Sequence, residues 1–200
     1  MKRYARLNLK FNPFGELTRE QRRQVAVAEL TNVLDWLSEP RRAVQFVGPC
    51  GHGKSSHLHA LARQRKDSLY VRADRESGPV ADTPLLLMDE ADASWPWTRW
   101  ARYRRAQQLA LALHRPRTTE LRAFGFDVLT IHVASAAPDR LRRIFDARSE
   151  LARRQPGPVP RVPAAVVRQL VDLHGANVRA MEHQLYDAVE RLEEVGDVSL

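Results

Sequence analysis

The sequence predicts an α/β protein in which a five-stranded parallel sheet, flanked by helices, is followed by a small all-helical region. Three observations lead to this prediction. Five short apolar runs alternate with polar or helical stretches, a glycine-rich loop follows the first run, and the pattern beyond residue 138 is helical only. Apolar runs joined by crossovers are typical of a parallel sheet covered by helices on both faces.

The N-terminal segment carries two local signals. Residues 5–11 alternate between apolar and polar side chains, which predicts a half-buried strand. The sequence Asn-Pro-Phe-Gly at 12–15 then breaks the chain. Thr18 and Gln21 have the spacing of a capping box, and the helix that they begin is expected to extend to Leu37.

Five apolar runs have the length of strands. They are Val44–Val47, Leu69–Val71, Leu85–Met88, Leu109–Leu113 and Val128–Val133. The fourth run, Leu-Ala-Leu-Ala-Leu, could equally extend the preceding helix, because periodicity alone does not separate a buried strand from a buried helix. We expect a strand there, since the sheet would otherwise have four.

Three helices are predicted after the sheet, over residues 138–154, 163–173 and 177–194. Asn177 is a suitable N-cap for the last helix, and Gly175 suits the end of the one before it. We therefore expect a core over residues 1–137, including the N-terminal strand and helix, and a helical lid over residues 138–200.

Composition narrows the class of protein. The 200 residues are 44% hydrophobic and 28% charged, as in ordinary globular domains. A single cysteine, Cys50, excludes a disulfide scaffold and a cysteine-rich zinc module. No apolar run is long enough to span a membrane and none follows the basic N-terminus as in a secretory signal, so a cytoplasmic protein is expected. The net charge of +8 raises the possibility of a nucleic-acid partner.

The loop after the first strand matches the pattern G-x-x-x-x-G-K-[ST] of a P-loop. Its candidate phosphate-binding residues are Gly48, Pro49, Cys50, Gly51, His52, Gly53, Lys54, Ser55 and Ser56. Glycines allow successive backbone N–H groups to point at phosphate oxygens, and the N-terminus of the following helix adds positive potential. Lys54 would bridge the β- and γ-phosphates, and the hydroxyl of Ser55 would bind Mg²⁺.

Two acids follow the third apolar run. Asp89 stands at the expected tip of that strand, where it can hold Mg²⁺, and Glu90 can polarise an attacking water molecule. The string Asp-Glu-Ala-Asp also occurs in helicases, but those enzymes need two such domains and this chain has room for one.

These motifs together resemble an AAA+ ATPase over roughly residues 40–194, with the loop as its Walker A motif and Asp89-Glu90 as its Walker B motif. The stretch Gly-Ala-Asn-Val-Arg-Ala-Met-Glu at 175–182 resembles the sensor-2 motif in the lids of bacterial replication initiators and their relatives. The resemblance implies that Arg179 contacts the γ-phosphate and couples the lid to the nucleotide.

The same resemblance implies two further roles. Sensor 1, a polar residue at the tip of the strand between the P-loop strand and the Asp-Glu strand, would be His114, or Ser135 if the last apolar run is that strand. An arginine finger that enters a neighbouring subunit's site would be Arg122, with Arg115 and Arg117 as alternatives.

Other features remain open or depart from the family. Phe14 could stack on adenine, or it could belong to a plain turn that packs the first helix. Only residues 73–84 separate the second and third runs, and they contain no aromatic residue. Because a threading unfoldase needs an aromatic grip there, we argue against protein unfolding.

Residues 94–105 interleave tryptophans and a tyrosine with arginines. Such a segment is typical of single-stranded nucleic-acid binding. The spacing of Trp97, Trp100 and Tyr103 equally fits a helix whose aromatic stripe packs on the sheet while its arginines face solvent, and we favour that interpretation. The acidic segment 182–200 could also pair with a basic face of a second copy.

The sequence thus predicts an ATPase that binds ATP or ADP with Mg²⁺ at an intersubunit site of a homo-oligomer, with no membrane association. Its output would be a nucleotide-controlled switch or assembly step on DNA or on a partner protein. The alternatives are a nucleotide-binding interaction module with negligible turnover and, less favoured because of the sensor-2-like lid, a P-loop kinase of small molecules.

Overall fold

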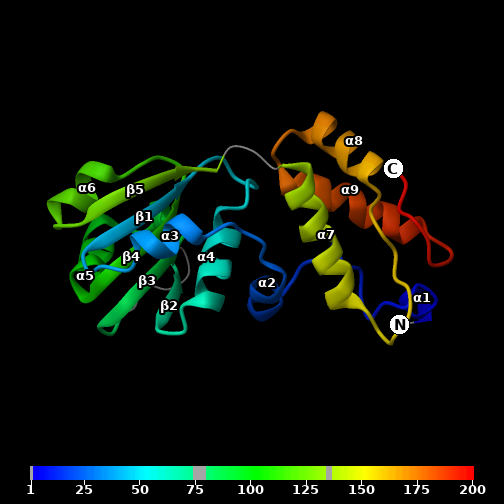
Figure 1. Ribbon diagram of the computed structural model, residues 1–200, viewed down its shortest axis with the longest axis horizontal. Coiled ribbons are helices and arrows are strands. Elements are labelled where there is room, and N and C mark those ends of the chain that lie inside the picture. The colour runs from blue at the N-terminus through cyan, green and yellow to red at the C-terminus, as the bar shows by residue number, and fades with distance from the viewer. Residues whose placement is uncertain (1, 74–79, 134–136) are drawn as a thin grey trace. The chain divides into compact units, whose positions relative to one another are not determined.

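The computed structural model describes residues 2–73, 80–133 and 137–200, and the chain forms two compact units (Figure 1). One unit is Ala28–Ala134 and contains the sheet. The other combines the two ends of the chain, Met1–Val27 and Ser135–Leu200, and is helical. In the described part of the chain, no helix is long and apolar enough to cross a membrane.

The sheet has five strands, all parallel, in the order β2-β3-β4-β1-β5. Their bounds are β1 Arg42–Val47, β2 Ser68–Arg72, β3 Thr83–Asp89, β4 Ala106–Leu113 and β5 Asp127–His132. The predicted parallel sheet and all five of its strands are confirmed. The uncertain fourth run is a strand, because its backbone pairs with both β1 and β3 in the middle of the sheet.

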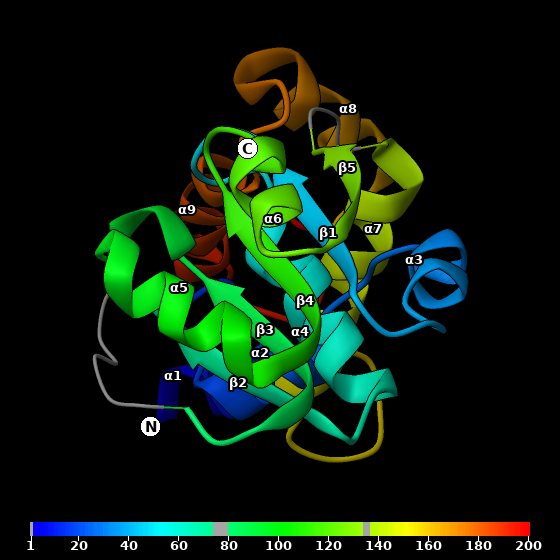
Figure 2. The ribbon, with the colours of Figure 1, turned by 90° about the vertical axis from the view of Figure 1, so that its left-hand side faces the viewer.

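Helices cover both faces of the sheet (Figure 2). They are α3 Thr31–Trp36, α4 Lys54–Gln64, α5 Pro96–Arg105 and α6 Thr118–Ala123, with the short 3₁₀ helix η1 Ala91–Ala93. Consecutive residues of β1 face opposite ways: the ring of Phe46 meets His57 of α4, whereas the amide of Gln45 meets Thr118 of α6. Both faces of the central strand are therefore buried, as its near-continuous apolar run predicts.

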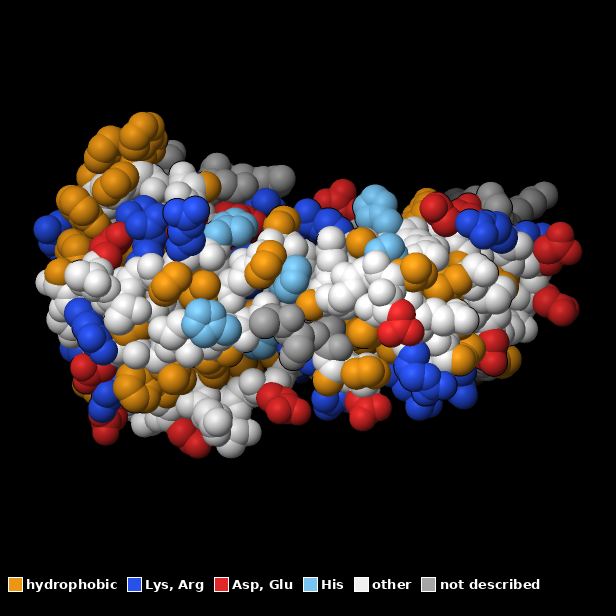
Figure 3. Space-filling view, turned by 90° about the horizontal axis from the view of Figure 1, so that it is seen from above, with side chains coloured by type: hydrophobic (Ala, Val, Ile, Leu, Met, Phe, Trp, Pro, Cys, Tyr) orange, Lys and Arg blue, Asp and Glu red, His pale blue; other side chains and the backbone are white. Residues whose placement is uncertain are grey.

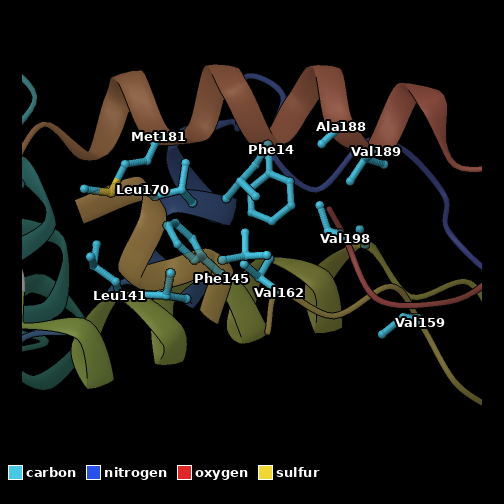
Figure 4. Packing of buried hydrophobic residues seen from close by; sticks show 14 of the residues in the cluster. Phe14, Leu141, Phe145, Val159, Val162, Leu170, Met181, Ala188, Val189 and Val198 are labelled. Atoms are coloured by element: carbon cyan, nitrogen blue, oxygen red, sulfur yellow. The ribbon is translucent and has the colours of Figure 1, made fainter. Parts of the chain in front are cut away.

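The helical unit is built on α7 Pro138–Ala152, α8 Ala164–His174 and α9 Val178–Arg191, together with α1 Lys2–Ala5 and α2 Arg19–Val25. The three predicted C-terminal helices are confirmed. They enclose an apolar core that also includes Leu7, Leu9 and Phe14 from the N-terminal segment (Figure 4). The ring of Phe14 meets that of Phe145 edge to face, at 5.7 Å between centroids.

The predicted N-terminal strand is wrong. Leu7 and Leu9 are buried as the alternation requires, but Asn8 between them has a left-handed backbone with φ of 56°. Its side-chain amide donates to the carbonyls of Gln155 and Pro158, which holds this turn against the chain that follows α7. The segment makes a single bridge, Leu9 with Arg153, instead of a ladder.

The predicted helix from the capping box to Leu37 is also divided. Thr18 and Gln21 make both hydrogen bonds of the box, so the predicted start is confirmed. The first helix ends at Val25, because Ala26 turns to an extended conformation with ψ of 119°, and a second helix begins at Thr31. The two pieces serve different units: α2 packs on α7, and α3 packs on β1.

The N-terminal segment therefore belongs with the C-terminal helices and not, as the predicted division at residue 137 had it, with the sheet. Buried Arg148 of α7 fixes this arrangement. Its guanidinium donates to the carbonyls of Pro13 and Gly15, at 2.7 Å each, and forms a 2.9 Å ion pair with Glu182 of α9. Phe14 lies in the core between these contacts, so the alternative in which it stacks on adenine is excluded.

Candidate active site

The glycine-rich loop connects the carboxyl end of β1 to the N-terminus of α4, and its glycines answer specific backbone requirements. Gly51 and Gly53 have φ of 82° and 88°, a region that disfavours side chains. A Cβ on Gly48 would lie 2.6 Å from the carbonyl oxygen of Val133, so any side chain there would displace the backbone after β5. The path of the loop therefore favours glycine at these three positions.

Helix α4 begins at Lys54, immediately after Gly53, and spans 11 residues. The first N–H groups of a helix have no carbonyl partner within it, and the helix dipole places positive potential at this end. The loop around them is accessible: Gly51, His52 and Gly53 are half-buried, and Cys50 is exposed. This is the geometry of an anion site fit for phosphate.

Lys54 is the cation of this loop. It is 8% exposed, and its Nζ donates to the carbonyl oxygens of Gly48 and Pro49, at 2.8 Å each. The ammonium group is therefore held against the loop by neutral acceptors. No carboxylate in the described ranges pairs with it, so its full charge is available to an anion.

Ser55 and Asp89, which lie 34 positions apart in the sequence, meet at the carboxyl edge of the sheet. The hydroxyl of Ser55 donates to Oδ1 of Asp89 at 3.0 Å, and the backbone N–H of Glu90 donates to the same oxygen at 3.1 Å. Asp89 is only 5% exposed. The structure therefore joins the two sequence motifs at one point.

Tyr70 of β2 also contacts Asp89, a contact that sequence patterns did not predict. Its hydroxyl donates to Oδ2 of Asp89 at 2.6 Å, and its ring stacks on His59 of α4 at 4.7 Å. The signal that could have found it is positional: β2 and β3 are adjacent parallel strands, so a polar group near the end of β2 lies beside the tip of β3.

All of these contacts to Asp89 come from neutral donors. No lysine or arginine within the described residues forms an ion pair with this buried carboxylate. A hard oxygen ligand beside a serine hydroxyl is what Mg²⁺ uses when most of its other ligands are water and substrate phosphate. The donor set of Ser55 and Asp89 therefore fits this cation.

Glu90 has a conformation unusual for its residue type. Its φ of 51° and ψ of 39° lie in the left-handed region, between the end of β3 and η1. Non-glycine residues in this region cost free energy and concentrate at functional sites. Its half-buried carboxylate makes no hydrogen bond or ion pair with any residue the structure describes, so it remains free to hold a water molecule.

The chain after β4 contains the predicted sensor and finger. His114 follows β4, which lies between β1 and β3 as the first alternative for sensor 1 requires. Its backbone N–H donates to Asp92 of η1 at 2.5 Å, and its ring Nδ1 lies 3.4 Å from the same carboxylate. The second alternative, Ser135, lies outside the described residues.

The arginines of this region differ in whether their guanidinium groups form ion pairs within the chain. Arg117 forms ion pairs with Asp92 at 3.0 Å and with Glu120 at 3.1 Å, so its guanidinium is used within the chain. Arg122, in the last turn of α6, is exposed, and so is Arg115. The guanidinium of neither residue makes a hydrogen bond or ion pair with a described residue.

Gln45 fixes the position of α6, and sequence reasoning missed it inside an apolar strand. It is fully buried, and its amide donates to the hydroxyls of Thr118 and Thr130, at 2.6 and 2.7 Å. Its carbonyl oxygen accepts from the backbone N–H of Arg117 at 2.8 Å. This satisfied buried network attaches the start of the helix that carries Arg122 to the centre of the sheet.

Arg179 belongs to the helical unit, in the first turn of α9, and is exposed. The side chain of Asn177 accepts from the backbone N–H of Ala180 at 3.2 Å, so the predicted N-cap is confirmed. The preceding helix has its C-cap at Gly175, where φ is 59°. The Gly-x-Asn-Val-Arg string thus forms a sharply capped junction between α8 and α9.

No protein-family model and no curated protein matches this chain. Solved structures do match. Cdc6p from Pyrobaculum aerophilum has a TM-score of 0.54 and 14% identity over 93% of this chain and 65% of its own. The RuvB Holliday junction branch migration motor from Thermotoga maritima has a TM-score of 0.54 and 13% identity, over 96% of this chain and 70% of its own.

A variant of the same RuvB protein matches with a TM-score of 0.54, over 84% of this chain and 64% of its own. This chain thus spans about two thirds of the length of the proteins it resembles. At this identity the likeness concerns the fold: a parallel five-stranded P-loop sheet with helices on both faces and C-terminal helices, the fold of AAA+ ATPases.

Proposed function

We propose that this chain is an AAA+ ATPase that binds ATP with Mg²⁺ and hydrolyses it. The observation that carries the proposal is the meeting of Ser55 and Asp89 at 3.0 Å, at the N-terminus of the helix that begins with Lys54, whose ammonium group pairs with no described carboxylate. Ser55 and Asp89 are the two oxygen ligands that would hold the metal of a nucleotide bound at this loop. The same arrangement explains why Asp89 is buried with only neutral partners.

In this proposal each side chain has one role. The N–H groups of the loop and Lys54 bind the β- and γ-phosphates and neutralise their charge. Ser55 and Asp89 hold Mg²⁺, which supplies charge stabilisation to the phosphates when it is bound. Glu90 orients the attacking water molecule and accepts its proton.

We further propose that the site is completed between subunits of a homo-oligomer. Arg122 is exposed and has no described partner in its own chain, whereas Arg117 is engaged by two carboxylates. A free guanidinium can stabilise the negative charge of a transition state in a neighbouring site. His114 is proposed as sensor 1, and Arg179 as the residue that couples the helical unit to the γ-phosphate. The output is a nucleotide-controlled switch on DNA or on a partner protein.

Binding is tested with Lys54→Ala. Saturating ATP stabilises a binding protein by about 2.7 kcal/mol when its concentration is a hundredfold above Kd. We expect the unmodified chain to show this stabilisation as an increase in Tm, and the variant to lose it. Lys66→Ala, which changes a lysine outside the loop, should keep the full increase. An equal increase in Tm in the Lys54 variant would refute the site.

A site shared between subunits is tested by measuring ATP turnover at different protein concentrations. Turnover per subunit should rise with protein concentration as the oligomer forms, and Arg122→Ala should abolish that rise while ATP still binds. Arg168→Ala, at an exposed position on α8, is the control. ATP binding with no turnover at any concentration would instead indicate a nucleotide-binding interaction module.

A further inference from the structure

Helix α5 exposes the aromatic side chains that the sequence suggested would be buried. Trp95 is 67% exposed, Trp97 62% and Trp100 39%. The residues that face the sheet unit's core are instead Tyr103, Arg99 and Arg102, all nearly inaccessible. The prediction of an inward aromatic stripe is therefore wrong for two of its three members, and the helix buries arginines in their place.

Arginines are buried in place of the tryptophans because their positions on α5 allow interior contacts. Arg99 forms a bidentate ion pair with Glu120 of α6 and donates to the carbonyl of Ser94 at 2.6 Å, so its charge is satisfied in the interior. Tyr103 packs edge to face on Phe124, at 5.5 Å between centroids. Arg99, Arg102 and Tyr103 lie on one face of the helix, and that face leaves Trp97 and Trp100 outside.

The exposed rings form one surface, which we call the tryptophan surface: Trp95, Trp97, Trp100 and the partly buried Phe124. The rings of Trp95 and Trp97 are stacked, 4.9 Å apart and 13° from parallel. Trp97 and Trp100 are neighbours on α5, and Trp100 approaches Phe124 at 6.1 Å. Figure 3 shows hydrophobic side chains standing out at this end of the molecule, beside Lys and Arg side chains.

The charge around these rings is positive. Arg104 is exposed and lies over the ring of Phe124, at 5.3 Å. The two described carboxylates on the adjoining elements, Asp92 and Glu120, are both bound by arginines. Arg105 is more than half exposed and makes only a loose 3.6 Å contact with exposed Asp82.

We infer that the tryptophan surface binds single-stranded nucleic acid, with unpaired bases stacked on the indole rings and phosphates near Arg104 and Arg105. Stacking on an exposed indole stabilises each bound base, and arginines contribute the salt-dependent part of the affinity. The proposed function leaves open whether the partner is DNA or a protein, and this inference specifies a nucleic acid. It rests on the proposed function only in so far as ATP would control the binding.

Two observations favour this partner over an acidic protein segment. The stacked pair presents flat rings, which match the flat face of any base and need no pocket. The cations lie beside the rings on the same helix, as is needed to bind a strand whose bases are attached to a backbone of phosphates. A duplex hides its base faces, so the surface should distinguish single strands from double strands.

The test uses fluorescence, because three of the four tryptophans belong to this surface. Oligothymidine added to the full chain at low salt should quench tryptophan emission, and a duplex of the same length should quench it less. The fourth tryptophan, Trp36, is half-buried and donates its indole N–H to the carbonyl of Ala43 at 3.0 Å. Trp36→Phe should therefore leave the quenching intact.

Affinity is measured by the anisotropy of labelled oligothymidine. Trp97→Ala should weaken binding at least about fivefold, the loss of one stacked base. Leu173→Ala, at an equally exposed apolar position on α8, should have no effect. Arg104→Ala should reduce the slope of log affinity against log salt by about 0.7, the loss of one phosphate contact to a single strand.

Several results would overturn the inference: no binding at low salt, unchanged affinity in Trp97→Ala, tighter binding of duplex than of single strand, or equal quenching by polyglutamate. Because the indoles are exposed, their replacement should leave the fold intact. A melting curve equal to that of the unmodified chain would show that the variant is folded. Lys54→Ala should lose ATP binding and keep oligothymidine binding, so the two proposals fail separately.

Discussion

The carboxylates of Asp89 and Glu120 lie in the same sheet unit and have opposite surroundings. Asp89 accepts hydrogen bonds only from neutral donors in the described chain: Ser55, Tyr70 and a backbone N–H. Glu120 is bound by two arginines. Burial by itself opposes ionisation of Glu120, but the hydrogen bonds and charges of Arg99 and Arg117 outweigh it and hold its pKa below its usual value.

The difference between these two surroundings indicates which carboxylate stabilises the fold and which is available to a ligand. A carboxylate cancelled by arginine stabilises the fold and has nothing left for a ligand. A carboxylate positioned by neutral donors keeps its charge for a cation. The same distinction separates Arg117, which is engaged, from Arg122, which is exposed and unpaired among the described residues. Variants of the two kinds should therefore affect different properties.

Glu90→Gln should have the largest effect, and on turnover alone. The amide keeps the size of the side chain but cannot accept the proton of the attacking water molecule, so kcat should fall by about 100- to 10,000-fold. ATP binding and thermal stability should be unchanged, because the carboxylate has no described partner. Release of phosphate is the measurement, with Glu193→Gln as an exposed control; normal turnover in the Glu90 variant would remove this residue from its role.

Glu120→Ala should have the opposite profile and chiefly destabilise the fold. The substitution leaves Arg99, which is 3% exposed, without its carboxylate, and breaking such a buried pair costs about 3 kcal/mol or more. Urea unfolding measures the loss. Asp127→Ala, which removes an exposed partner of Arg42, should cost much less.

The lowered pKa of Glu120 adds a pH dependence with a definite sign. Its stabilisation is present above the unfolded pKa of about 4.3 and is lost as the pH falls through the lower folded value. Glu120→Gln should therefore lose stability mainly at neutral pH and approach the unmodified chain in acid. A constant difference across the range would contradict the paired state of this carboxylate.

Tyr70→Phe should have an intermediate effect. It removes one hydrogen bond to a charged group and costs about 1.5 kcal/mol. Since Asp89 then loses one of the contacts that position it, the Mg²⁺ concentration needed for half-maximal turnover should rise. Tyr186→Phe, at an exposed position on α9, is the control, and an unchanged Mg²⁺ requirement would make Tyr70 a packing residue only.

Glu90→Gly should have the smallest effect on stability, and a stabilising one. Glycine adopts the left-handed conformation without the cost of a Cβ, so the free energy of unfolding should rise by up to about 1 kcal/mol while turnover is lost. Thermal unfolding measures it. A decrease in stability would show that this backbone conformation is not strained.

Motif spacing predicted most of the sheet unit. Five apolar runs gave five parallel strands, and the glycine pattern with Asp89 marked the corner where Ser55 and Asp89 meet. These features depend on short stretches of chain and on the rule that parallel strands end at one edge. Tyr70 and Gln45 could not be found in this way, because their partners lie on other strands and helices.

The N-terminal segment and α5 show where hydrophobic periodicity does not predict the structure correctly. Alternation at 5–11 correctly marked Leu7 and Leu9 as buried, but the left-handed turn at Asn8 comes from hydrogen bonds to residues almost 150 positions away. On α5 the periodicity located a helix and could not tell which face was inside. That choice depended on Glu120, which lets Arg99 enter the interior and leaves the tryptophans outside.

The amino-acid sequence by itself determined the fold class, the position of the glycine-rich loop and the two acids after β3, because backbone requirements and strand length are local properties. Only the tertiary structure decided which charges are free. A guanidinium or carboxylate is available to a ligand when no partner from another element cancels it. That condition concerns the distances between elements, which no single stretch of chain encodes.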